Sequence, residues 1–483
     1  MLLKTQESTC LLSILRAVVG VLVARRSRVA TLTAVTVAAA LSACSDTPEP
    51  VGPAGHAPIV ADAQSSSSGT LIITSNTTLA EDHYGNILIA ADNVTLDCAG
   101  HTVFGPGLSG FSGGIEVDGR AGITVRRCAV TGFDVNGIFA GGSSGGRYEA
   151  NILSTNGAHG IHLDLGSGNV VIGNMSRSNS GGGIILTRST QSRIESDTVE
   201  NNPPLGIGLS DASHDNVVAH NVALGNGNGF VLDNATGNAL DYNTATANQI
   251  GLVITDASNA NTIENNTFQD NTGETGVLLQ GSVGNVLGNN TALRNIIGFV
   301  LDNGANANEL RGNTASLNAQ YGFFTRASTN NLVAGNTSLQ NDIGFVLWNG
   351  SANQFRGNNA NLNRLQGFEV IRGSSGNILD SNTVNRNLIG IEITDGSRSN
   401  TISRNVANGN TFEGFKVFMA NSNTFTGNTG NSNGTFGFLV FGGSSFNTLT
   451  ANVGRANHSL DALDDGSGTG NVWTNNNFGA TGV

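Results

Sequence analysis

The chain has 483 residues, a formal net charge of −12 and only 12% charged residues. It has no basic stripe, and an acidic surface repels phosphate, so the chain is not expected to bind nucleic acid. Glycine is abundant at 66 residues, asparagine recurs throughout, and the segment from Leu205 to Val483 has no proline. Glycine and asparagine disfavour long helices and central strands exclude proline, so the composition predicts an all-β protein.

Residues 1–43 are predicted to be an export signal. A basic cluster at residues 25–28 precedes an apolar run at residues 29–43, which is shorter than the roughly 20 residues of a membrane-spanning helix. The run ends in LSAC, residues 41–44, which resembles the bacterial lipoprotein signal. This resemblance implies cleavage before Cys44, lipid modification of its thiol, and a membrane-anchored lipoprotein of the bacterial cell envelope, on its periplasmic or cell-surface face. A plain secretory signal is the alternative.

Residues 44–69 are rich in proline, glycine and serine and contain little apolar surface to bury. They are predicted to be a flexible tether. Residues 70–483 then form one domain that includes its N- and C-terminal caps. Without the signal the chain keeps 18 basic and 34 acidic residues, a net charge of −16, so its surface is expected to be acidic.

A repeated unit fills most of residues 70–483. Its first part is Gly-[Ile/Phe/Leu/Val]-x-apolar, which recurs every 22 to 25 residues. The recurring glycines are Gly114, Gly137, Gly160, Gly183, Gly206, Gly229, Gly251, Gly276, Gly298, Gly322, Gly344, Gly367, Gly390, Gly414 and Gly437. Its second part spaces three asparagines five residues apart, as in Asn308, Asn313 and Asn318. Such units cannot bury an apolar face alone, so the pattern predicts a solenoid of stacked coils.

Each unit contains three short alternating stretches, which predict three short strands. Asparagine and glycine between them are expected to supply left-handed backbone at sharp bends. Stacking in register places asparagine over asparagine, so hydrogen-bonded asparagine ladders are expected between coils. The phenylalanines after the recurring glycines should point inward and form one aromatic stack. They are Phe230, Phe299, Phe323, Phe345, Phe368, Phe415 and Phe438.

These units resemble right-handed parallel β-helix repeat proteins of the pectate-lyase-like superfamily, and most of all its NosD-like branch of carbohydrate-binding and sugar-hydrolase proteins. The similarity covers residues 70–483, with an entry segment at Asn93–Gly105 followed by Ile123–Phe133 and an exit segment at Ser467–Gly479. It implies an all-β, right-handed parallel β-helix (solenoid) of about 17 coils of 22 to 25 residues with asparagine ladders. It implies little about activity, because the branch contains enzymes, binding modules and uncharacterised proteins.

Cys98 and Cys128 are the cysteines that remain after the signal and the anchor. They fall in adjacent early coils on matching strands, with an offset of about one residue. An oxidising compartment permits a disulfide between them. Two stacked free thiols are the alternative.

The first candidate site lies on the outward face of early coils, because inward residues form the core. Its members are Glu116, Asp118, His162 and Asp164, with His159 at the adjoining bend. Carboxylates two coils apart lie roughly 10 Å from each other, which is wide enough to flank a sugar. His162 beside Asp164 could act as a general base. These residues are the catalytic candidates if the chain is an enzyme, although the hydrolase and epimerase signatures of the superfamily are absent. Solvated polar residues on an outward strand are the alternative.

The second candidate site is an outward apolar ribbon over six coils, from Val231 to Val346. An exposed apolar ribbon with a polar border often marks a binding surface. Sugar rings stack on aromatic side chains, while carboxylates and arginines hold hydroxyl groups. The candidate ligand-binding residues are Asp302, Phe324, Arg326, Trp348, Phe418 and Phe441. Two alternatives are that β-branched residues merely suit strands and that rods associate side by side.

No cofactor or metal is required by the sequence. Asp461, Asp464 and Asp465 could hold Ca²⁺, or could form a capping turn. Copper is not expected, because Met175 and Met419 are the only methionines of the exported chain and no soft-ligand cluster accompanies them.

The predicted function is therefore a cell-envelope-anchored protein that binds polysaccharide or cell-surface glycan through outward strand positions. One alternative is a carbohydrate-active enzyme, namely a polyuronate lyase, an epimerase or a hydrolase-like protein. Another is a structural or adhesive envelope protein without catalytic activity. The oligomeric state stays open.

Overall fold

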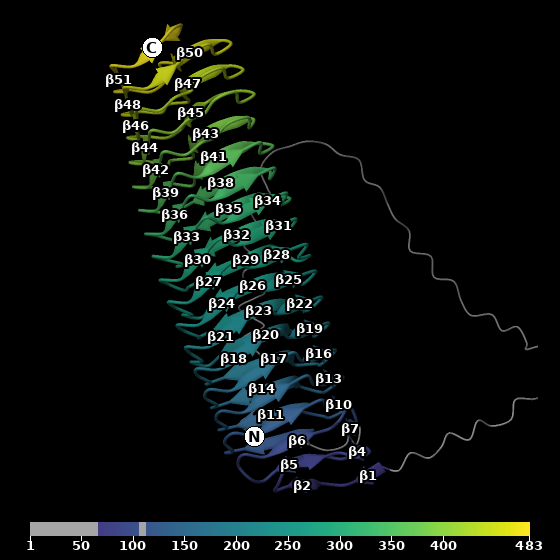
Figure 1. Ribbon diagram of the computed structural model, residues 1–483. Helices are drawn as coiled ribbons and strands as arrows, with labels where there is room; N and C mark the ends of the chain where they lie inside the picture. The colour runs from purple at the N-terminus through teal and green to yellow at the C-terminus, as the bar shows by residue number, and fades with distance from the viewer. Residues whose placement is uncertain (1–65, 106–112) are drawn as a thin grey trace, which may run out of the picture. The chain divides into compact units, whose positions relative to one another are not determined.

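The computed structural model describes residues 66–105 and 113–483, which form a right-handed parallel β-helix of about 17 coils (Figure 1). The predicted export signal, Cys44 and most of the predicted tether lie outside the described residues. The last tether residues, Ser66–Ser68, form strand β1. The described residues contain no helix, and so none that is long and apolar enough to cross a membrane.

Most coils give one short strand to each of three parallel sheets, called A, B and C below, and the chain passes from B to C to A. Sheet A contains β1 (Ser66–Ser68), β4 (Asp82–Tyr84), β7 (Thr102–Phe104), β10 (Ala129–Thr131), β13 (Ile152–Ser154), β16 (Met175–Arg177), β19 (Thr198–Glu200), β22 (Val222–Leu224), β25 (Thr244–Thr246), β28 (Thr267–Gln269), β31 (Thr291–Leu293), β34 (Thr314–Ser316), β37 (Thr337–Leu339) and β40 (Asn359–Asn361). Single bridges continue its column to the short pair β49 (Val453–Gly454) and β52 (Asn477–Phe478).

Sheet B has the longest strands and carries the recurring glycine motif. It contains β2 (Leu71–Ile73), β5 (Ile87–Ile89), β8 (Ile115–Asp118), β11 (Ile138–Gly141), β14 (His159–Asp164), β17 (Gly182–Thr187), β20 (Leu205–Ser210), β23 (Asn228–Asp233), β26 (Ile250–Thr255), β29 (Thr275–Gln280), β32 (Ile297–Asp302), β35 (Tyr321–Arg326), β38 (Ile343–Trp348), β41 (Gln366–Ile371), β43 (Ile389–Thr394), β45 (Phe415–Phe418), β47 (Phe436–Phe441), β50 (Leu460–Asp464) and β53 (Thr481–Gly482).

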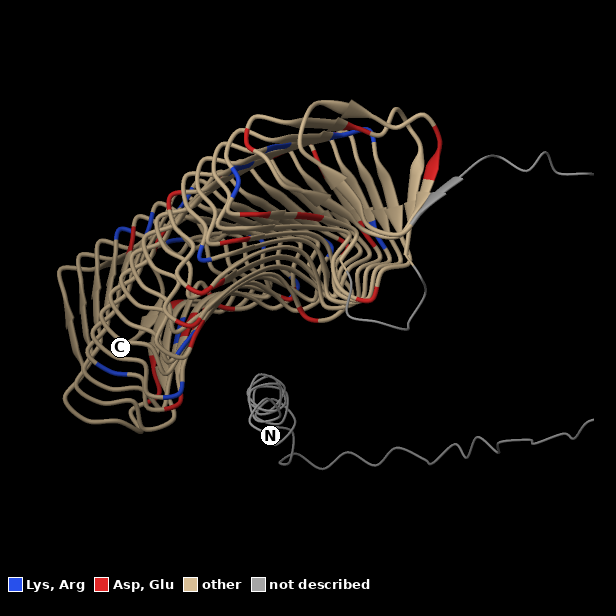
Figure 2. Cartoon of the chain, turned by 90° about the horizontal axis from the view of Figure 1, so that it is seen from below, with Lys and Arg blue, Asp and Glu red and all other residues tan. Residues whose placement is uncertain are grey.

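Sheet C contains β3 (Thr77–Thr78), β6 (Thr95–Asp97), β9 (Thr124–Arg126), β12 (Arg147–Glu149), β15 (Val170–Ile172), β18 (Arg193–Glu195), β21 (Val217–Ala219), β24 (Ala239–Asp241), β27 (Thr262–Glu264), β30 (Val286–Gly288), β33 (Glu309–Arg311), β36 (Leu332–Ala334), β39 (Gln354–Arg356), β42 (Ile378–Asp380), β44 (Thr401–Ser403), β46 (Thr424–Thr426), β48 (Thr448–Thr450) and β51 (Val472–Thr474). Seen from below, successive coils superpose and charged residues lie around their rim (Figure 2).

The core is a column of inward apolar side chains, but its aromatic stack is interrupted. Four rings stack in consecutive coils, with centroids 4.9, 4.7 and 4.5 Å apart, from Phe299 to Phe368. Ile391 occupies the next coil, and Phe415 and Phe438 then form a separate pair 4.6 Å apart. The prediction of one continuous stack is wrong, because aliphatic residues fill the same inward position in several coils.

Three asparagine ladders run along the corners between the sheets, as the spacing predicted. Asn290 shows the pattern: its N–H and its Nδ2 both donate to Oδ1 of Asn313 in the next coil, at 2.9 and 3.0 Å. Its Nδ2 also donates to the carbonyl of Ile263 in the preceding coil at 2.8 Å. Both asparagines are fully buried. Each such bond contributes about 0.5–1.5 kcal/mol, and leaving a buried partner unpaired costs about 1–3 kcal/mol, so the ladders bind each coil to its neighbours.

Glycines and asparagines are among the left-handed residues, as the sequence predicted, but the ladder asparagines and the recurring glycines are not. The ladder asparagines have ordinary backbone angles, and the residue before each is left-handed, as Asn289 is (φ 53°) before Asn290. The recurring glycines are not left-handed either. A Cβ on Gly298 would stand 2.5 Å from the carbonyl oxygen of Gly322 and 2.9 Å from Cβ of Ala315. These glycines are therefore needed for space between coils.

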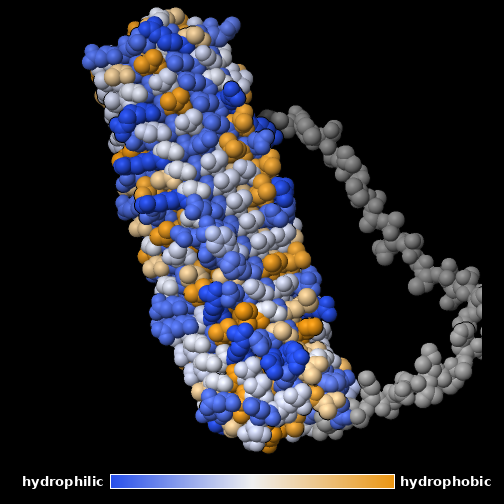
Figure 3. All heavy atoms as spheres, in the orientation of Figure 1, coloured by the Kyte–Doolittle hydropathy of each residue, from blue (hydrophilic) through white to orange (hydrophobic). Residues whose placement is uncertain are grey.

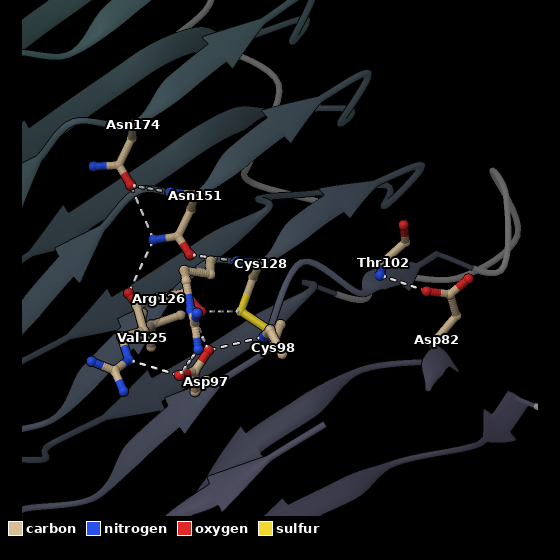
Figure 4. The surroundings of a disulfide bond; sticks show 11 residues. Asp82, Asp97, Cys98, Thr102, Val125, Arg126, Cys128, Asn151 and Asn174 are labelled. Atoms are coloured by element: carbon tan, nitrogen blue, oxygen red, sulfur yellow. Dashed lines mark hydrogen bonds and ion pairs between the residues drawn. A yellow bond between two sulfur atoms is a disulfide. The ribbon is translucent and has the colours of Figure 1, made fainter. Parts of the chain in front are cut away.

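Cys98 and Cys128 form a disulfide with Cα atoms 4.7 Å apart (Figure 4). Both are buried where the corner between sheets C and A begins. The N–H of Cys128 donates to Oδ1 of Asn151 at 3.0 Å, and Asn151 continues the ladder to Asn174. The disulfide thus replaces an asparagine pair at the start of this ladder. The sequence had left the disulfide and two free thiols as alternatives.

One position in the same ladder holds a carboxyl group instead of an amide. Asp197 Oδ1 accepts hydrogen bonds from N and Nδ2 of Asn174 at 2.6 and 2.8 Å, as an asparagine would. Its Oδ2 is buried without a hydrogen-bond partner, where the other coils have an Nδ2 donor. Burial raises the pKa of Asp197 to about 7. The ionised carboxylate is therefore a defect in the ladder at neutral pH.

We expect Asp197→Asn to stabilise the protein at pH 8 by about 1–3 kcal/mol, because the amide restores the missing donor. The folded state binds one more proton than the unfolded state between the ordinary aspartate pKa and about 7, so the stability of the parent protein falls as pH rises through that window. The gain should consequently shrink at acidic pH. Melting temperatures of both proteins at several pH values measure it. Asn221→Asp, the reverse change one coil later, should create the same pH-dependent loss; equal stability of Asp197→Asn and parent at pH 8 would contradict the assignment.

Candidate functional site

The outward side chains of sheet B, called the sheet B face below, lie at three positions in each long strand. In β14 they are His159, His162 and Asp164. Most members of this face are half-buried or buried, and Val300 and Val346 are only 7% and 1% exposed. Neighbouring coils and the adjoining outward positions cover them, so the predicted exposed apolar ribbon is wrong. Figure 3 accordingly shows hydrophobic and hydrophilic residues interspersed on the surface it displays.

The first candidate site is less convergent than the sequence indicated. Phe139 lies between Glu116 and His162 in the register, and its ring packs against the His162 ring with centroids 5.4 Å apart. One coil likewise separates Asp118, which is exposed, from Asp164, which is half-buried. These four residues share a face, but they do not converge on one point.

Asp164 and His162 are each engaged by a residue of the next coil. Arg188, which the sequence analysis missed, donates to both oxygens of Asp164 at 2.6 and 2.8 Å. His162 Nε2 lies 3.1 Å from Oγ1 of Thr187. Burial lowers the pKa of His162, and the Arg188 charge adds to this while Asp164 opposes it. Burial and His162 lower the pKa of His159 to about 4, and its buried Nδ1 has no hydrogen-bond partner. The two histidines are neutral at neutral pH.

The residues of the second candidate site form two separate groups on the sheet B face, and one further residue joins the first group. Asp302, Arg326 and Trp348 occupy the same position in consecutive coils. Arg326 donates two hydrogen bonds of 2.6 Å to Asp302, which is buried. The Phe324 ring packs edge-on against Trp348 with centroids 6.4 Å apart. Arg372, which the sequence analysis missed, lies over the Trp348 ring at 5.1 Å. Paired charges and aromatic rings therefore alternate along this part of the face.

Phe418 and Phe441 form a second aromatic platform further along the face. Their rings stack with centroids 4.7 Å apart and an interplanar angle of 26°. Both side chains are half-buried. In the same column, Ile371 and Thr394 lie between Trp348 and Phe418, so the two aromatic groups are separate.

A polar group between these aromatic platforms was not selected from the sequence. It comprises Gln366, Glu369, Glu392 and Lys416 and is called the Glu369 cluster below. Lys416 Nζ lies 2.9 Å from Oε1 of Glu392, and Gln366 Nε2 donates to Oε2 of Glu392 at 2.6 Å. Burial raises the pKa of Glu369 to about 7, and the Glu392 charge adds to this. A sequence signal existed, because three of these residues occupy one outward column in consecutive coils.

Two of the three C-terminal aspartates, Asp461 and Asp464, cap ladders, and Asp465 accepts hydrogen bonds from the N–H groups of Gly442 and Ser467 in a turn. Asp461 accepts hydrogen bonds from Nδ2 of Asn457 at 2.8 Å and from N of Gly479 at 2.8 Å, and so ends one ladder. Asp464 accepts from Nδ2 of Asn471 at 3.0 Å and ends another. Within residues 66–105 and 113–483, no three His, Cys, Asp or Glu side chains are grouped so that they could hold a metal ion. The geometry thus favours the capping turn over a Ca²⁺ site.

An open groove lies at the corner between sheets A and B. Asn361, Leu362, Asn385, Arg386, Asn408, Gly409 and Ser432 line it. Its asparagines are engaged between coils: N of Asn385 donates to Oδ1 of Asn361 at 2.6 Å, and N of Asn408 donates to Oδ1 of Asn385 at 2.8 Å. Because these side chains already bond between coils, the groove is a structural feature of the β-helix.

We expect Arg188→Ala to raise the pKa of His162, because the substitution removes a positive charge and leaves Asp164 unpaired. The pKa should stay below the ordinary histidine value, since burial remains. Nuclear magnetic resonance titration of the histidine ring measures it. Arg294→Ala, which breaks the similar ion pair with Asp270 far along the chain, is the matched control and should leave His162 unchanged. An unaltered His162 titration in Arg188→Ala would contradict the geometry.

Two protein-family models match the part of the chain that contains the repeat. Residues 63–222 and 109–275 match the family model of the periplasmic copper-binding protein NosD, and residues 250–407 and 349–454 match the model of the right-handed β-helix region. A search of curated proteins found no significant match.

Solved structures with local likeness include three enzymes. The periplasmic alginate epimerase AlgG is 13% identical, covers 74% of this chain and 76% of its own, and has a TM-score of 0.39. The A-module of the mannuronan C-5 epimerase AlgE6 from Azotobacter vinelandii is 14% identical, covers 84% and 91%, and has a TM-score of 0.34. The pectate lyase Pel9A is 18% identical, covers 48% and 66%, and has a TM-score of 0.26. Similarity at this level says nothing about the activity of this chain.

The family models rest on the same repeat that builds the three parallel sheets and their corner ladders. Together they show that this chain is a right-handed parallel β-helix protein.

Proposed function

We propose that this protein binds polysaccharide along the sheet B face between β32 and β47. The observation that carries the proposal is that two separate pairs of aromatic rings lie on this one face, with charged side chains beside and between them. Phe324 and Trp348 form one platform, and Phe418 and Phe441 form another. Six coil steps of roughly 4.8 Å span about 29 Å, which suits an extended chain of several sugar rings.

The polar groups on this face support the same function. Arg326, whose guanidinium is fixed by the buried Asp302, and the stacked Arg372 present hydrogen-bond donors beside the rings. Sugar hydroxyl groups need such fixed partners, while the apolar faces of sugar rings pack on aromatic side chains. A binding role therefore uses both the charges and the rings of this face.

A lyase or epimerase reaction at Glu116, Asp118, His162 and Asp164 has less support. Such a reaction needs a general base next to the reacting carbon and a cation for the uronate. His162 is already hydrogen-bonded to Thr187, and Arg188 is paired with Asp164. The geometry provides no convergent acid–base pair among the described residues there.

We place the protein in the bacterial cell envelope, anchored through a lipid on Cys44. The LSAC ending of the export signal supports this placement, and the description of the NosD family as periplasmic agrees with it. The proposal does not include copper, because the described residues contain no group of three or more histidine, cysteine or carboxylate ligands.

We expect Trp348→Ala and the double variant Phe418→Ala/Phe441→Ala to weaken polysaccharide binding about tenfold or more, because each removes a stacking platform. Tenfold corresponds to about 1.4 kcal/mol. Affinity electrophoresis of the purified protein against neutral, acidic and amino-sugar polysaccharides measures this. Tyr242→Ala removes an exposed aromatic ring outside the face and is the matched control.

Two results would contradict the proposal: no retention by any polysaccharide, or unchanged retention of the platform variants. Ultraviolet absorbance in the same incubations detects unsaturated uronates. Their appearance would favour the lyase alternative.

A further inference from the structure

The Glu369 cluster has fewer cations than carboxylates. Glu369 and Glu392 are direct neighbours in the register, and Lys416 is the next residue of the same column. Lys416 lies 2.9 Å from Glu392, which is only 7% exposed. Glu369 forms no ion pair and accepts no hydrogen bond among the described residues. The Lys416 charge lowers the pKa of Glu369, but Lys416 makes its ion pair with Glu392, so one carboxyl group of the cluster has no ion-pair partner of its own.

Gln366 adds a second unmet acceptor to the cluster. Its Nε2 donates to Glu392, and its Oε1 is buried without a hydrogen-bond partner. A buried acceptor left unpaired costs about 1–3 kcal/mol, so a donor that reaches this oxygen would stabilise the cluster. A bound group with a positive charge and several N–H bonds would pair with Glu369 and donate to Gln366 Oε1.

Lys416 shows which group this environment accepts. Its ammonium lies against the Glu392 carboxylate and 5.7 Å from the centroid of the Phe441 ring. A primary ammonium can donate three hydrogen bonds and is attracted to an aromatic face. A second ammonium beside Glu369 would meet the same kinds of partners and balance the charge of the cluster.

The ionisation of Glu369 agrees with a missing cation. Burial and the Glu392 charge raise its pKa to about 7, so the carboxyl group is only partly ionised at neutral pH. A bound cation favours the ionised form and returns the pKa towards its ordinary value.

We propose that the Glu369 cluster binds the primary ammonium group of an amino sugar, so that the polysaccharide bound by this protein contains hexosamines without N-acetyl groups. This inference rests on the proposed function. It follows from the unpaired Glu369 and Gln366 acceptors between two aromatic platforms, Trp348 on one side and Phe418 with Phe441 on the other.

A sugar fits better than the two other obvious ligands. A polyuronate would bring more carboxylates to a cluster that already has an excess, on a chain of net charge −12. A lysine side chain of a protein carries the same ammonium, but it has no ring to pack on the flanking platforms. The amino sugar uses the cluster and the platforms together.

The test compares oligosaccharides of equal length by isothermal titration calorimetry on the full-length protein. Glucosamine hexasaccharide carries ammonium groups, and N-acetylglucosamine hexasaccharide is its neutral counterpart. We expect the glucosamine oligomer to bind at least about tenfold more tightly and to lose affinity in added salt. Equal or weaker binding of the glucosamine oligomer overturns the inference, and this comparison needs no variant.

Glu369→Gln then locates the site. It keeps the shape of the side chain and removes its charge, so glucosamine binding should fall about tenfold while N-acetylglucosamine binding stays unchanged. Glu264→Gln, the same change on sheet C, is the matched control and should have no effect. Unchanged glucosamine binding in a folded Glu369→Gln protein overturns the assignment.

The remaining outcomes separate this inference from the proposed function. Binding that depends on Trp348 without preference for ammonium groups refutes only the ligand class. Absence of binding to every polysaccharide refutes the function as well. If hexalysine binds as tightly as the glucosamine oligomer and loses the same affinity in Glu369→Gln, the ligand is a peptide ammonium, and the sugar assignment fails.

Discussion

The buried hydrogen bond from one asparagine to the asparagine of the next coil is the interaction on which this structure depends. Most ladder asparagines donate twice to the coil ahead and once to the coil behind, as Asn290 does. A shift of one residue at any corner would leave these buried groups unpaired, at about 1–3 kcal/mol each. The ladders thus set the register of all three sheets, and the inward apolar residues then follow.

Because the register is set at the corners, side chains on the faces meet partners 22 to 26 residues away. Asp302 pairs with Arg326, Asp164 pairs with Arg188, and Glu392 pairs with Lys416, in each case one coil apart. A face can therefore change its chemistry from coil to coil without any change in the backbone. The outward residues of sheet B vary from coil to coil on a constant scaffold, whereas the repeated residues serve the core, the ladders and the close approach of coils.

The repeat made the fold and the three ladders predictable from the sequence, because spacing alone decides which asparagines stack. The roles of individual side chains were harder to predict from the sequence. The recurring glycines, such as Gly298, serve close approach of coils and not left-handed backbone, and period alone does not distinguish the two.

The sequence correctly indicated which outward residues of sheet B align in columns, but it did not indicate how deeply they are buried. The burial of Val346 depends on side chains at adjoining positions, which a single column does not reveal. Arg188 was missed because it reaches Asp164 from one position further along the next coil.

Asp197 and Glu369 show how location separates a defect from a site. Burial raises the pKa of both carboxyl groups to about 7. Asp197 lies inside the ladder, where the place of the missing donor is filled by an amide in every neighbouring coil, so a single substitution completes it. Glu369 lies on the outward face beside the unpaired Oε1 of Gln366, and no repeat partner supplies its donor. An acceptor without a donor inside the ladder lowers the stability of the protein. We infer that such an acceptor on the outward face, between aromatic rings, binds a ligand instead.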